Sequence, residues 1–269
     1  KKNESGIEIS GVEVIAIDKG PGIANLQLQM IDGHSSTGTY GIGLGAVRRL
    51  SHEFDIYTLP GKGTVLWMVL WADECEPEQP FWQIGAICVP IDGEDVCGDN
   101  WAIAAYQRTL TLMVADGLGH GPAAAIASDA AVALVAQHAD QSPTVILQRA
   151  HGALHGTRGA AVAVSKIDPD NTRLNFAGVG NISVCVFYPD NSRHLVSHNG
   201  IVGSNLRKLQ EFSEVWESDA LLIAHSDGIN TRWDVDTYPE LRHCHPGLIA
   251  AVIYRDFSRE RDDATVVVI

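Results

Sequence analysis

The amino-acid sequence predicts an α+β protein whose main part is a layered sandwich of strands and helices. Apolar strand-like runs follow one another between residues 81 and 115. Two helix-like segments come next, the first from Pro122 to about His138 and the second from Pro143 to Leu154. Strand-like runs then return and continue to the C-terminus. Strands followed by helices and again by strands favour an α+β sandwich over alternating βαβ units.

Each expected element of this part has its own signal. The first helix carries a proline near its first turn, where a missing N–H costs nothing, and its middle is small and apolar almost all round. Such a helix is expected to be buried against a sheet. The expected strands are 81–89, 101–106, 109–115, 160–167, 173–177, 183–187, 220–224 and 264–269, and a further helix is expected over 247–257.

The N-terminal part shows a different pattern, in which a glycine-rich stretch lies between strand-like runs. The hairpin is expected to turn at Pro60-Gly-Lys-Gly63, because such a cluster ends one strand and starts the next. The expected elements are a strand over 7–17, a helix over Leu44–Glu53, and the two hairpin strands 55–58 and 64–71.

An acidic segment divides the chain. Residues 73–80, with the sequence DECEPEQP, are rich in acidic side chains and proline and lie between two apolar strand-like runs. A length of 269 residues is comfortable for two domains. We therefore expect an N-terminal domain over 1–72, a linker over 73–80 and a larger domain over 81–269. Because the first residue is Lys1 rather than Met, we also expect further residues upstream of it.

Composition excludes some partners. The net charge of −14 argues against nucleic acid, which is bound by clustered lysine and arginine. We expect no membrane partner, because no apolar run reaches the length that spans a bilayer. The five cysteines are scattered without a CxxC pair, which favours reduced thiols in a cytoplasmic protein.

Four acidic motifs lie at the ends of expected strands. They are Gly98-Asp99-Asn100, Asp116-Gly-Leu-Gly-His-Gly121, Ser226-Asp227-Gly228 and Asp262-Asp263-Ala-Thr265. An Asp-Gly pair alone is most often a turn. Four such motifs together predict an all-oxygen site for hard divalent cations. Two ions at such a site can activate a bridging water and neutralise the phosphoryl oxygens that it attacks.

These motifs, in this order, resemble the stage II sporulation protein E type of protein phosphatase 2C. The similarity is greatest to the small stress-response phosphatases that act in partner switching, and it extends over 81–269. The stretches Thr157-Arg-Gly-Ala-Ala161, Phe176-Ala-Gly-Val-Gly-Asn181 and Ser197-His-Asn-Gly200 fit as well. The resemblance implies a four-layer αββα sandwich, with two antiparallel sheets between helices and two Mn²⁺ or Mg²⁺ ions at one end.

The resemblance also implies roles for individual residues. Asp116 would bridge both metals, and the Gly117 carbonyl would bind one of them. Asp227 and Asp262 would complete the other site, and Asp99 would bind a metal or support a residue that does. Asp116 and Asp227 are therefore expected to be both metal ligands and catalytic residues.

Three further residues are weighed against structural alternatives. Arg158 is the candidate for holding the phosphate, with an ordinary ion pair as the alternative. His120 is a candidate proton relay, although it could instead hydrogen-bond loop backbone. Asp263 is the less favoured ligand of its pair.

The N-terminal part resembles the GHKL ATPase fold, and within it the anti-sigma-factor serine kinases. The residues that carry this similarity are expected to bind the adenine and the phosphates of a nucleotide. They are Asp18, Gly20, Gly22, Gly38, Gly41, Gly43 and Gly45. The helix that supplies the Mg²⁺-binding asparagine and catalytic glutamate in that fold would precede Asp18, where the sequence reads as strand. This chain therefore has half a nucleotide site, and ATP is expected only if upstream residues complete it.

The sequence leads to one primary function and two alternatives. The primary function is metal-dependent hydrolysis of phosphoserine or phosphothreonine on a STAS-domain antagonist protein. One alternative is a bifunctional kinase and phosphatase in a longer parent chain, and the other is a non-catalytic anti-sigma-like binding module. The complete aspartate set argues against the binding module. The sequence leaves a homodimer open.

Overall fold

The computed structural model describes residues 9–31, 43–72, 80–206 and 208–269. The chain forms two compact units. The first consists of residues 1–85 together with 234–255, and the second of residues 86–233 together with 256–269. The first unit thus includes a segment that the sequence prediction placed in the larger domain. Within the described ranges, no helix is both long enough and apolar enough to cross a membrane.

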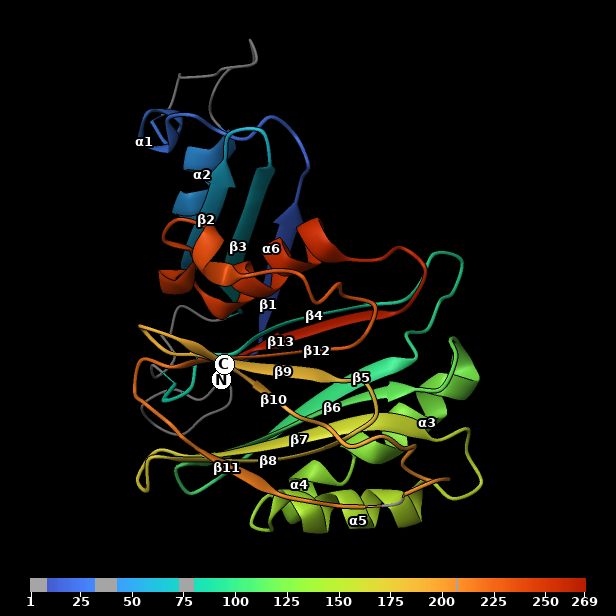
Figure 1. The fold of residues 1–269 in the computed structure, drawn as a ribbon. Helices are drawn as coiled ribbons and strands as arrows, with labels where there is room; N and C mark the ends of the chain where they lie inside the picture. The colour runs from blue at the N-terminus through green and yellow to red at the C-terminus, as the bar shows by residue number, and fades with distance from the viewer. Residues whose placement is uncertain (1–8, 32–42, 73–79, 207) are drawn as a thin grey trace. The chain divides into compact units, whose positions relative to one another are not determined.

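The first unit is built on a three-stranded antiparallel sheet in the order β1-β3-β2 (Figure 1). The strands β2 and β3 form the expected hairpin, with Thr58 opposite Thr64. Among the described residues, two helices lie between β1 and β2, and α2 ends before the expected helix end because β2 already begins at Glu53. The elements are β1 (Gly11–Ile17), α1 (Leu26–Gln29), α2 (Gly43–Leu50), β2 (Glu53–Leu59) and β3 (Gly63–Trp71).

Residues 234–255 cover one face of this sheet. The Tyr57 hydroxyl donates to the Pro239 carbonyl at 3.1 Å, and the His245 N–H donates to Asp55 Oδ2 at 2.8 Å. The His245 ring also stacks on Trp67, with ring centroids 3.6 Å apart. This covering segment consists of two short 3-10 helices, η1 (Val235–Thr237) and η2 (Leu241–His243), and most of α6 (Pro246–Phe257).

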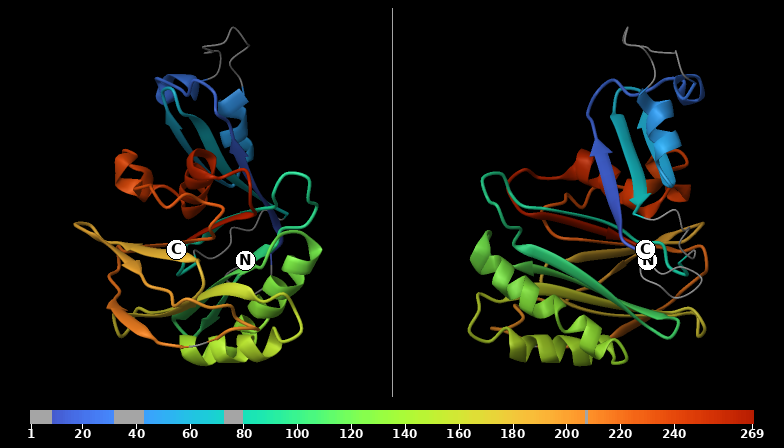
Figure 2. Two further views of the ribbon diagram at one scale, coloured as in Figure 1. Left: turned by 45° about the vertical axis from the view of Figure 1, so that its right-hand side comes forward. Right: turned by 180° about the vertical axis from the view of Figure 1, so that it is seen from behind.

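The second unit contains two five-stranded sheets, in the orders β10-β9-β12-β13-β4 and β11-β8-β7-β6-β5. The two sheets lie face to face, and α3 and α5 cover the outer face of the β5 to β8 sheet (Figures 1 and 2). The strands of the first sheet are β4 (Gly85–Val89), β9 (Ser183–Phe187), β10 (Ser192–Leu195), β12 (Leu221–His225) and β13 (Ala264–Val268). Those of the second are β5 (Asp99–Tyr106), β6 (Thr109–Gly117), β7 (Ala160–Asp168), β8 (Arg173–Val179) and β11 (Phe212–Val215).

The helical layer fixes one end of β6. The helices are α3 (Pro122–Val132), α4 (Val135–His138) and α5 (Pro143–Ala153). Ala124, Ala127 and Ala131 of α3 are fully buried, which confirms the expected burial of this helix against a sheet. A side chain on Gly117 would lie 2.1 Å from the Ala124 carbonyl oxygen, so only glycine lets the end of β6 approach α3 this closely. The residue before it, Asp116, is thereby held at a rigid edge.

Candidate metal centre

Strand register brings the first pair of aspartates together. Asp99 begins β5 and lies directly opposite Asp116 near the end of β6. The Gly117 N–H donates to the Gly98 carbonyl at 3.1 Å and closes the ladder beyond this pair. Both carboxylates therefore extend from the same end of one sheet, as the sequence motifs led us to expect.

The second pair comes from the other sheet. Asp227 follows β12, Asp262 precedes β13, and these two strands are paired. The Thr265 N–H donates to Ser226 Oγ at 3.0 Å, which fixes the two segments against each other. A side chain on Gly228 would lie 2.0 Å from the Asp263 carbonyl oxygen, so this turn also requires glycine.

The carboxylates of the two sheets influence one another. Burial, the largest cause, raises the pKa of Asp116 to about 8, and repulsion by Asp99, Asp227 and Asp262 adds to the shift. Burial also raises the pKa of Asp99 to about 7, against hydrogen bonds from Ser226 and Thr265 that lower it. The pKa of Asp262 is raised by burial and then by Asp227. Such mutual repulsion arises only when several acidic groups converge.

A divalent cation fits this arrangement. Asp99 is 4% exposed, and its Oδ2 has no hydrogen-bond partner among the described residues. A buried carboxylate oxygen is costly unless a hydrogen bond or a cation satisfies it. The described side chains form no group of three or more His, Cys, Asp or Glu that already has the spacing of a metal site. An open set of carboxylates suits Mg²⁺ or Mn²⁺, since Mg²⁺ usually keeps several of its waters.

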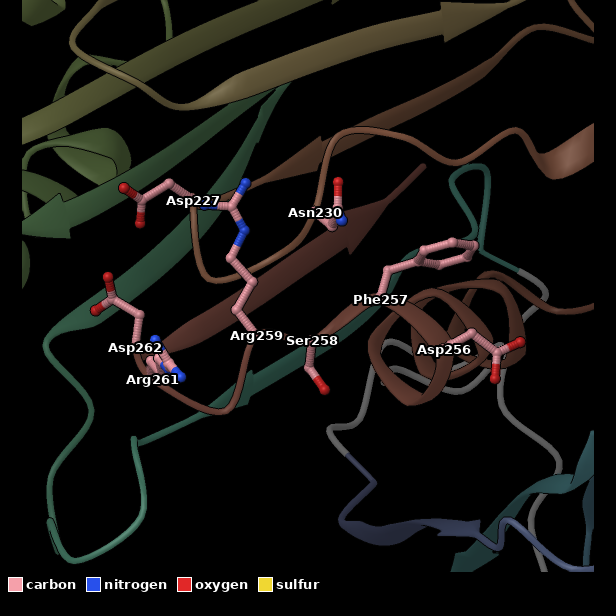
Figure 3. A pocket seen from close by; sticks show the side chains of 8 residues that line it. All are labelled: Asp227, Asn230, Asp256, Phe257, Ser258, Arg259, Arg261 and Asp262. Atoms are coloured by element: carbon pink, nitrogen blue, oxygen red, sulfur yellow. The ribbon is translucent and has the colours of Figure 1, made fainter.

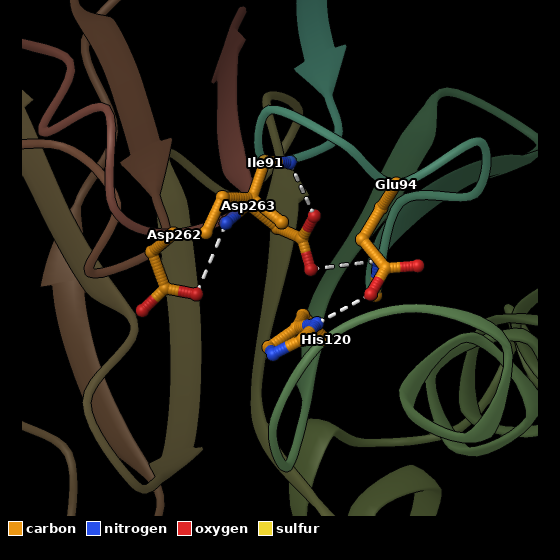
Figure 4. Close-up of polar contacts among 6 residues, drawn as sticks. Ile91, Glu94, His120, Asp262 and Asp263 are labelled. Carbon is orange, nitrogen blue, oxygen red and sulfur yellow. Dashed lines mark hydrogen bonds and ion pairs between the residues drawn. The ribbon is translucent and has the colours of Figure 1, made fainter.

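Asp263 has a structural task. Its Oδ1 accepts a hydrogen bond from the Ile91 N–H at 2.8 Å, and its Oδ2 accepts one from the Gly98 N–H at 2.9 Å (Figure 4). It thus holds both ends of the connection between β4 and β5. Both oxygens of Asp263 are therefore already used in hydrogen bonds, and the expectation that Asp262 is the ligand of the pair stays a prediction.

His120 lies in the loop after β6 and contacts a side chain that no sequence motif singled out. Its Nδ1 is 2.6 Å from Glu94 Oε1 (Figure 4). The sequence analysis offered a hydrogen bond from His120 to loop backbone as the alternative to a proton relay. In the structure this nitrogen contacts the Glu94 side chain instead. Glu94 could not be found from the motifs, because the pair is joined only through tertiary structure.

Arg158 lies beside the loop that carries His120. A side chain placed on Gly119 would be 3.0 Å from Arg158 Nη1, so the guanidinium rests against this loop. The Leu118 N–H donates to the Gly159 carbonyl at 3.0 Å, which ties the two segments together. Arg158 is exposed and forms no ion pair with another described residue, so the alternative of a structural ion pair has no support here.

A pocket of about 580 Å³ opens beside the second aspartate pair. Asp227 and Asp262 form part of its wall, and the Arg259 guanidinium points toward Asp227 (Figure 3). Arg261 lies next to Asp262 in the same wall. No sequence motif pointed to either arginine. Asn181, which ends one of the stretches that fit the family resemblance, was given no role there, and its Nδ2 donates to Asp227 Oδ2 at 2.6 Å.

The expected nucleotide-binding residues are only partly described. Gly38 and Gly41 lie outside the described residues, and Gly43 and Gly45 lie in α2. Asp18 Oδ1 accepts a hydrogen bond from the Gly20 N–H at 2.6 Å, so this carboxylate folds back on its own loop. Gly22 has φ +71° and packs so closely on the Leu59 carbonyl that no side chain would fit.

Comparison with known proteins adds a family match. The family model for stage II sporulation protein E (SpoIIE) matches residues 106–269. Phosphoserine phosphatase RsbX of Bacillus subtilis is 29% identical over 140 residues, which are 52% of this chain and 70% of RsbX. Serine/threonine-protein kinase RsbT of the same organism is 41% identical over 61 residues, which are 23% of this chain and 46% of RsbT.

Solved structures agree with the sequence match. One similar structure comes from the bacterial stressosome, a modular system that has been adapted to control secondary messenger signalling. It superposes with a TM-score of 0.65 at 29% identity, and the match covers 69% of this chain and 97% of that chain. RsbX in complex with magnesium gives a TM-score of 0.62 at 24% identity, covering 71% and 96%. These likenesses show a mixed α/β fold of the PP2C type, with several antiparallel sheets.

Proposed function

The chain belongs to the SpoIIE family of phosphatases, and we propose that it removes phosphate from serine or threonine of a STAS-domain protein in a partner-switching pathway. The observation that carries this proposal is the convergence of Asp99, Asp116, Asp227 and Asp262 from two sheets. These residues, with the Gly117 carbonyl, would hold two Mg²⁺ or Mn²⁺ ions. Bound ions of this kind supply an activated water and neutralise phosphoryl oxygens.

The remaining side chains would bind and orient the substrate. Arg158 rests on the loop after β6, where a guanidinium can hold two phosphate oxygens at once. Arg259 and Arg261 line the adjoining pocket and would attract an anionic group on the phosphoprotein. His120, whose Nδ1 contacts Glu94, would exchange a proton at its exposed ring.

A phosphoprotein substrate in a partner-switching system is supported by the relatives, and the STAS type of substrate is our proposal within it. RsbX is named as a phosphoserine phosphatase, and a likeness at 29% identity is to a stressosome structure. The protein is proposed to act in the cytoplasm, and a homodimer stays part of the proposal. A non-catalytic binding module would be free to lose metal ligands, whereas this chain keeps an aspartate in each of the four motifs.

The direct test is phosphate release from a phosphorylated STAS-domain protein in the presence of Mn²⁺. Chelation with EDTA should abolish it, and Asp116→Asn and Asp227→Asn should each lower kcat by orders of magnitude without unfolding the protein. Asp170→Asn is the matched control, because Asp170 is exposed and pairs with Arg108 away from the centre. Turnover that survives chelation would rule out the metal-dependent mechanism.

A second function is proposed for the N-terminal part. We propose that this part is a domain of GHKL descent over about 1–72, joined by the segment 73–80 to a phosphatase domain over 81–269. The 61-residue likeness to the kinase RsbT motivates this proposal. In a longer parent chain, this domain would bind ATP and phosphorylate the same substrate class. The match spans 46% of RsbT, so kinase activity is proposed for the longer parent chain alone.

A further inference from the structure

Two cysteines of the second unit have their sulfur atoms in contact. Cys88 Sγ lies 3.5 Å from Cys97 Sγ, at the two ends of the connection between β4 and β5. Cys88 is exposed, and Cys97 is half-buried. The Thr265 hydroxyl lies 3.2 Å from Cys88 Sγ and holds that thiol in place. In the described residues, Cys185 is buried and Cys244 bonds to the Glu240 carbonyl, so neither forms a comparable pair.

We propose that Cys88 and Cys97 form a reversible disulfide that weakens metal binding at the candidate centre; the inference rests on the proposed function. A peroxide is the oxidant. The exposed Cys88 sulfur attacks one peroxide oxygen, giving a sulfenic acid and one water. The Cys97 thiol then attacks that sulfur, and a second water leaves as the S–S bond forms. Two thiols lose two electrons and two protons, and one H₂O₂ becomes two waters. A dithiol reductant reverses the step by exchange.

The position of Cys97 connects this reaction to the metal ligands. Cys97 precedes Gly98 and Asp99, and the Asp99 carbonyl lies 3.6 Å from Cys88 Sγ. A disulfide bond is about 2.05 Å long, so the sulfur atoms must approach by roughly 1.5 Å from their present contact. Part of that movement falls on the backbone that leads into Asp99.

The surroundings of Gly98 leave little space to absorb the movement. A side chain placed there would lie 2.6 Å from Asp263 Oδ2 and 2.8 Å from the Ala124 side chain. The Gly98 N–H is also bonded to Asp263. Because Asp99 is buried and paired with Asp116, a shift of this segment changes the distance between two proposed ligands. Losses of about 10- to 100-fold in metal affinity are typical when a supporting contact of a ligand is disturbed.

The test uses the whole chain, first reduced and then exposed to hydrogen peroxide. Cleavage after Glu94 separates the two cysteines, so trypsin with Glu-C protease should release 79–94 linked to 95–108. Calorimetric titration with Mn²⁺ should show an affinity at least about tenfold lower for the oxidised protein, restored by dithiothreitol. Cys88→Ser and Cys97→Ser should bind Mn²⁺ normally and resist peroxide, while Cys244→Ser should remain sensitive.

Two results would overturn the inference: no link between the two fragments, or a complete link that leaves Mn²⁺ affinity unchanged. If the serine variants fold poorly by circular dichroism, Cys88→Ala and Cys97→Ala replace them. Failure of the proposed function looks different. In that case the reduced protein would not release phosphate from any phosphoprotein, although the link would form and Mn²⁺ affinity would still fall on oxidation.

Discussion

Asp99 and Asp116 lie directly opposite each other on the paired strands β5 and β6, and burial is the largest cause of the raised pKa of each carboxyl group. Paired acidic residues at such a position oppose folding when both are charged and no cation is present. Two sheets that place further aspartates nearby increase this cost. The four aspartates are therefore expected to lower the stability of the metal-free protein. Repulsion among them can be measured as a change in Tm.

The first prediction concerns pH and the stability of the metal-free protein. The pKa values of Asp99 and Asp116 rise from 3.8 to about 7 and about 8 on folding. The folded state therefore holds more protons than the unfolded state in this interval, and stability is lost as the pH rises through it. We expect a lower Tm at pH 8 than at pH 5 in EDTA, and Mn²⁺ should restore much of the loss at pH 8.

Thermal unfolding followed by circular dichroism checks this expectation. Asp99→Asn should raise the Tm of the metal-free protein at pH 8 and reduce the difference between the two pH values. Asp170→Asn should leave that difference unchanged, because Asp170 is exposed. A Tm in EDTA that is equal at pH 5 and pH 8 would show that the two carboxyl groups do not repel in the folded protein.

The second prediction separates phosphate binding from metal binding. Arg158→Ala should lower kcat/KM by about a hundredfold, as is typical when a donor to a developing negative charge is lost. Mn²⁺ affinity should not change, since Arg158 is not a ligand. Arg158→Lys should lie between, because it keeps the charge but not the planar fork. Arg193→Ala, which alters an exposed arginine elsewhere, is the control. A fall in Mn²⁺ affinity equal to the fall in kcat/KM would contradict this assignment.

The third prediction assigns the pocket beside Asp227 to the protein part of the substrate. Arg259→Ala and Arg261→Ala should raise KM for a folded phosphoprotein and leave hydrolysis of p-nitrophenyl phosphate nearly unchanged. Both arginines are exposed, so their attraction should weaken as salt is added. Equal losses with the small and the large substrate would place the arginines in the chemical step instead.

The fourth prediction distinguishes the neighbours Asp262 and Asp263. Asp263→Asn should lower the free energy of unfolding by about 1–3 kcal/mol, because an amide group cannot accept both the Ile91 and Gly98 N–H bonds. Asp262→Asn should instead weaken Mn²⁺ binding with little loss of stability in EDTA. Urea denaturation and Mn²⁺ titration of both variants give the comparison. The reverse pattern would make Asp263 the ligand.

Much of the fold could be expected from local sequence patterns, and the exceptions have clear causes. The strands β6, β7 and β13 are apolar runs, which single-sequence reasoning identifies well. The strands β10 and β11 are short and carry polar residues, such as Arg193 and Glu214, so neither shows the pattern of a strand. The expected long helix from Pro122 is divided into α3 and α4. At the break, the Leu134 N–H donates to the Ala131 carbonyl, three residues back, instead of to the carbonyl four residues back as in an α-helix.

Some residues of the site could be predicted from the sequence, and others could not. Aspartates at strand ends can be recognised in the sequence because each lies in a short motif with glycine or a second aspartate. Glu94 and Arg259 lie in no such motif, and the motif that ends at Asn181 gives no sign of its partner. Glu94 meets His120, and Asn181 and Arg259 approach Asp227, only in the folded chain (Figure 3). Residues 234–255 were assigned to the larger domain because the phosphatase resemblance runs through them. Their hydrogen bonds and ring stacking with the N-terminal sheet appear only in the folded chain.

The last prediction is that this chain does not bind Mg·ATP with micromolar affinity. The Asp18 carboxylate, which would accept the adenine amino group, already accepts the Gly20 N–H at 2.6 Å. Adenine would have to compete with or share that bond. In the GHKL fold that the N-terminal sequence resembles, a helix supplies the asparagine that binds Mg²⁺ and the base for the attacking hydroxyl.

Calorimetric titration of Mg·ATP into the protein measures the dissociation constant directly. The Asp18→Asn variant is the control, because it removes the carboxylate that would bind the adenine amino group. We expect little heat in either case and no transfer of γ-phosphate to a STAS-domain protein. A chain extended upstream of Lys1 should bind ATP more tightly if such a helix lies there. Micromolar binding by the present chain, abolished by Asp18→Asn, would mean that the loop after β1 completes a nucleotide site without that helix.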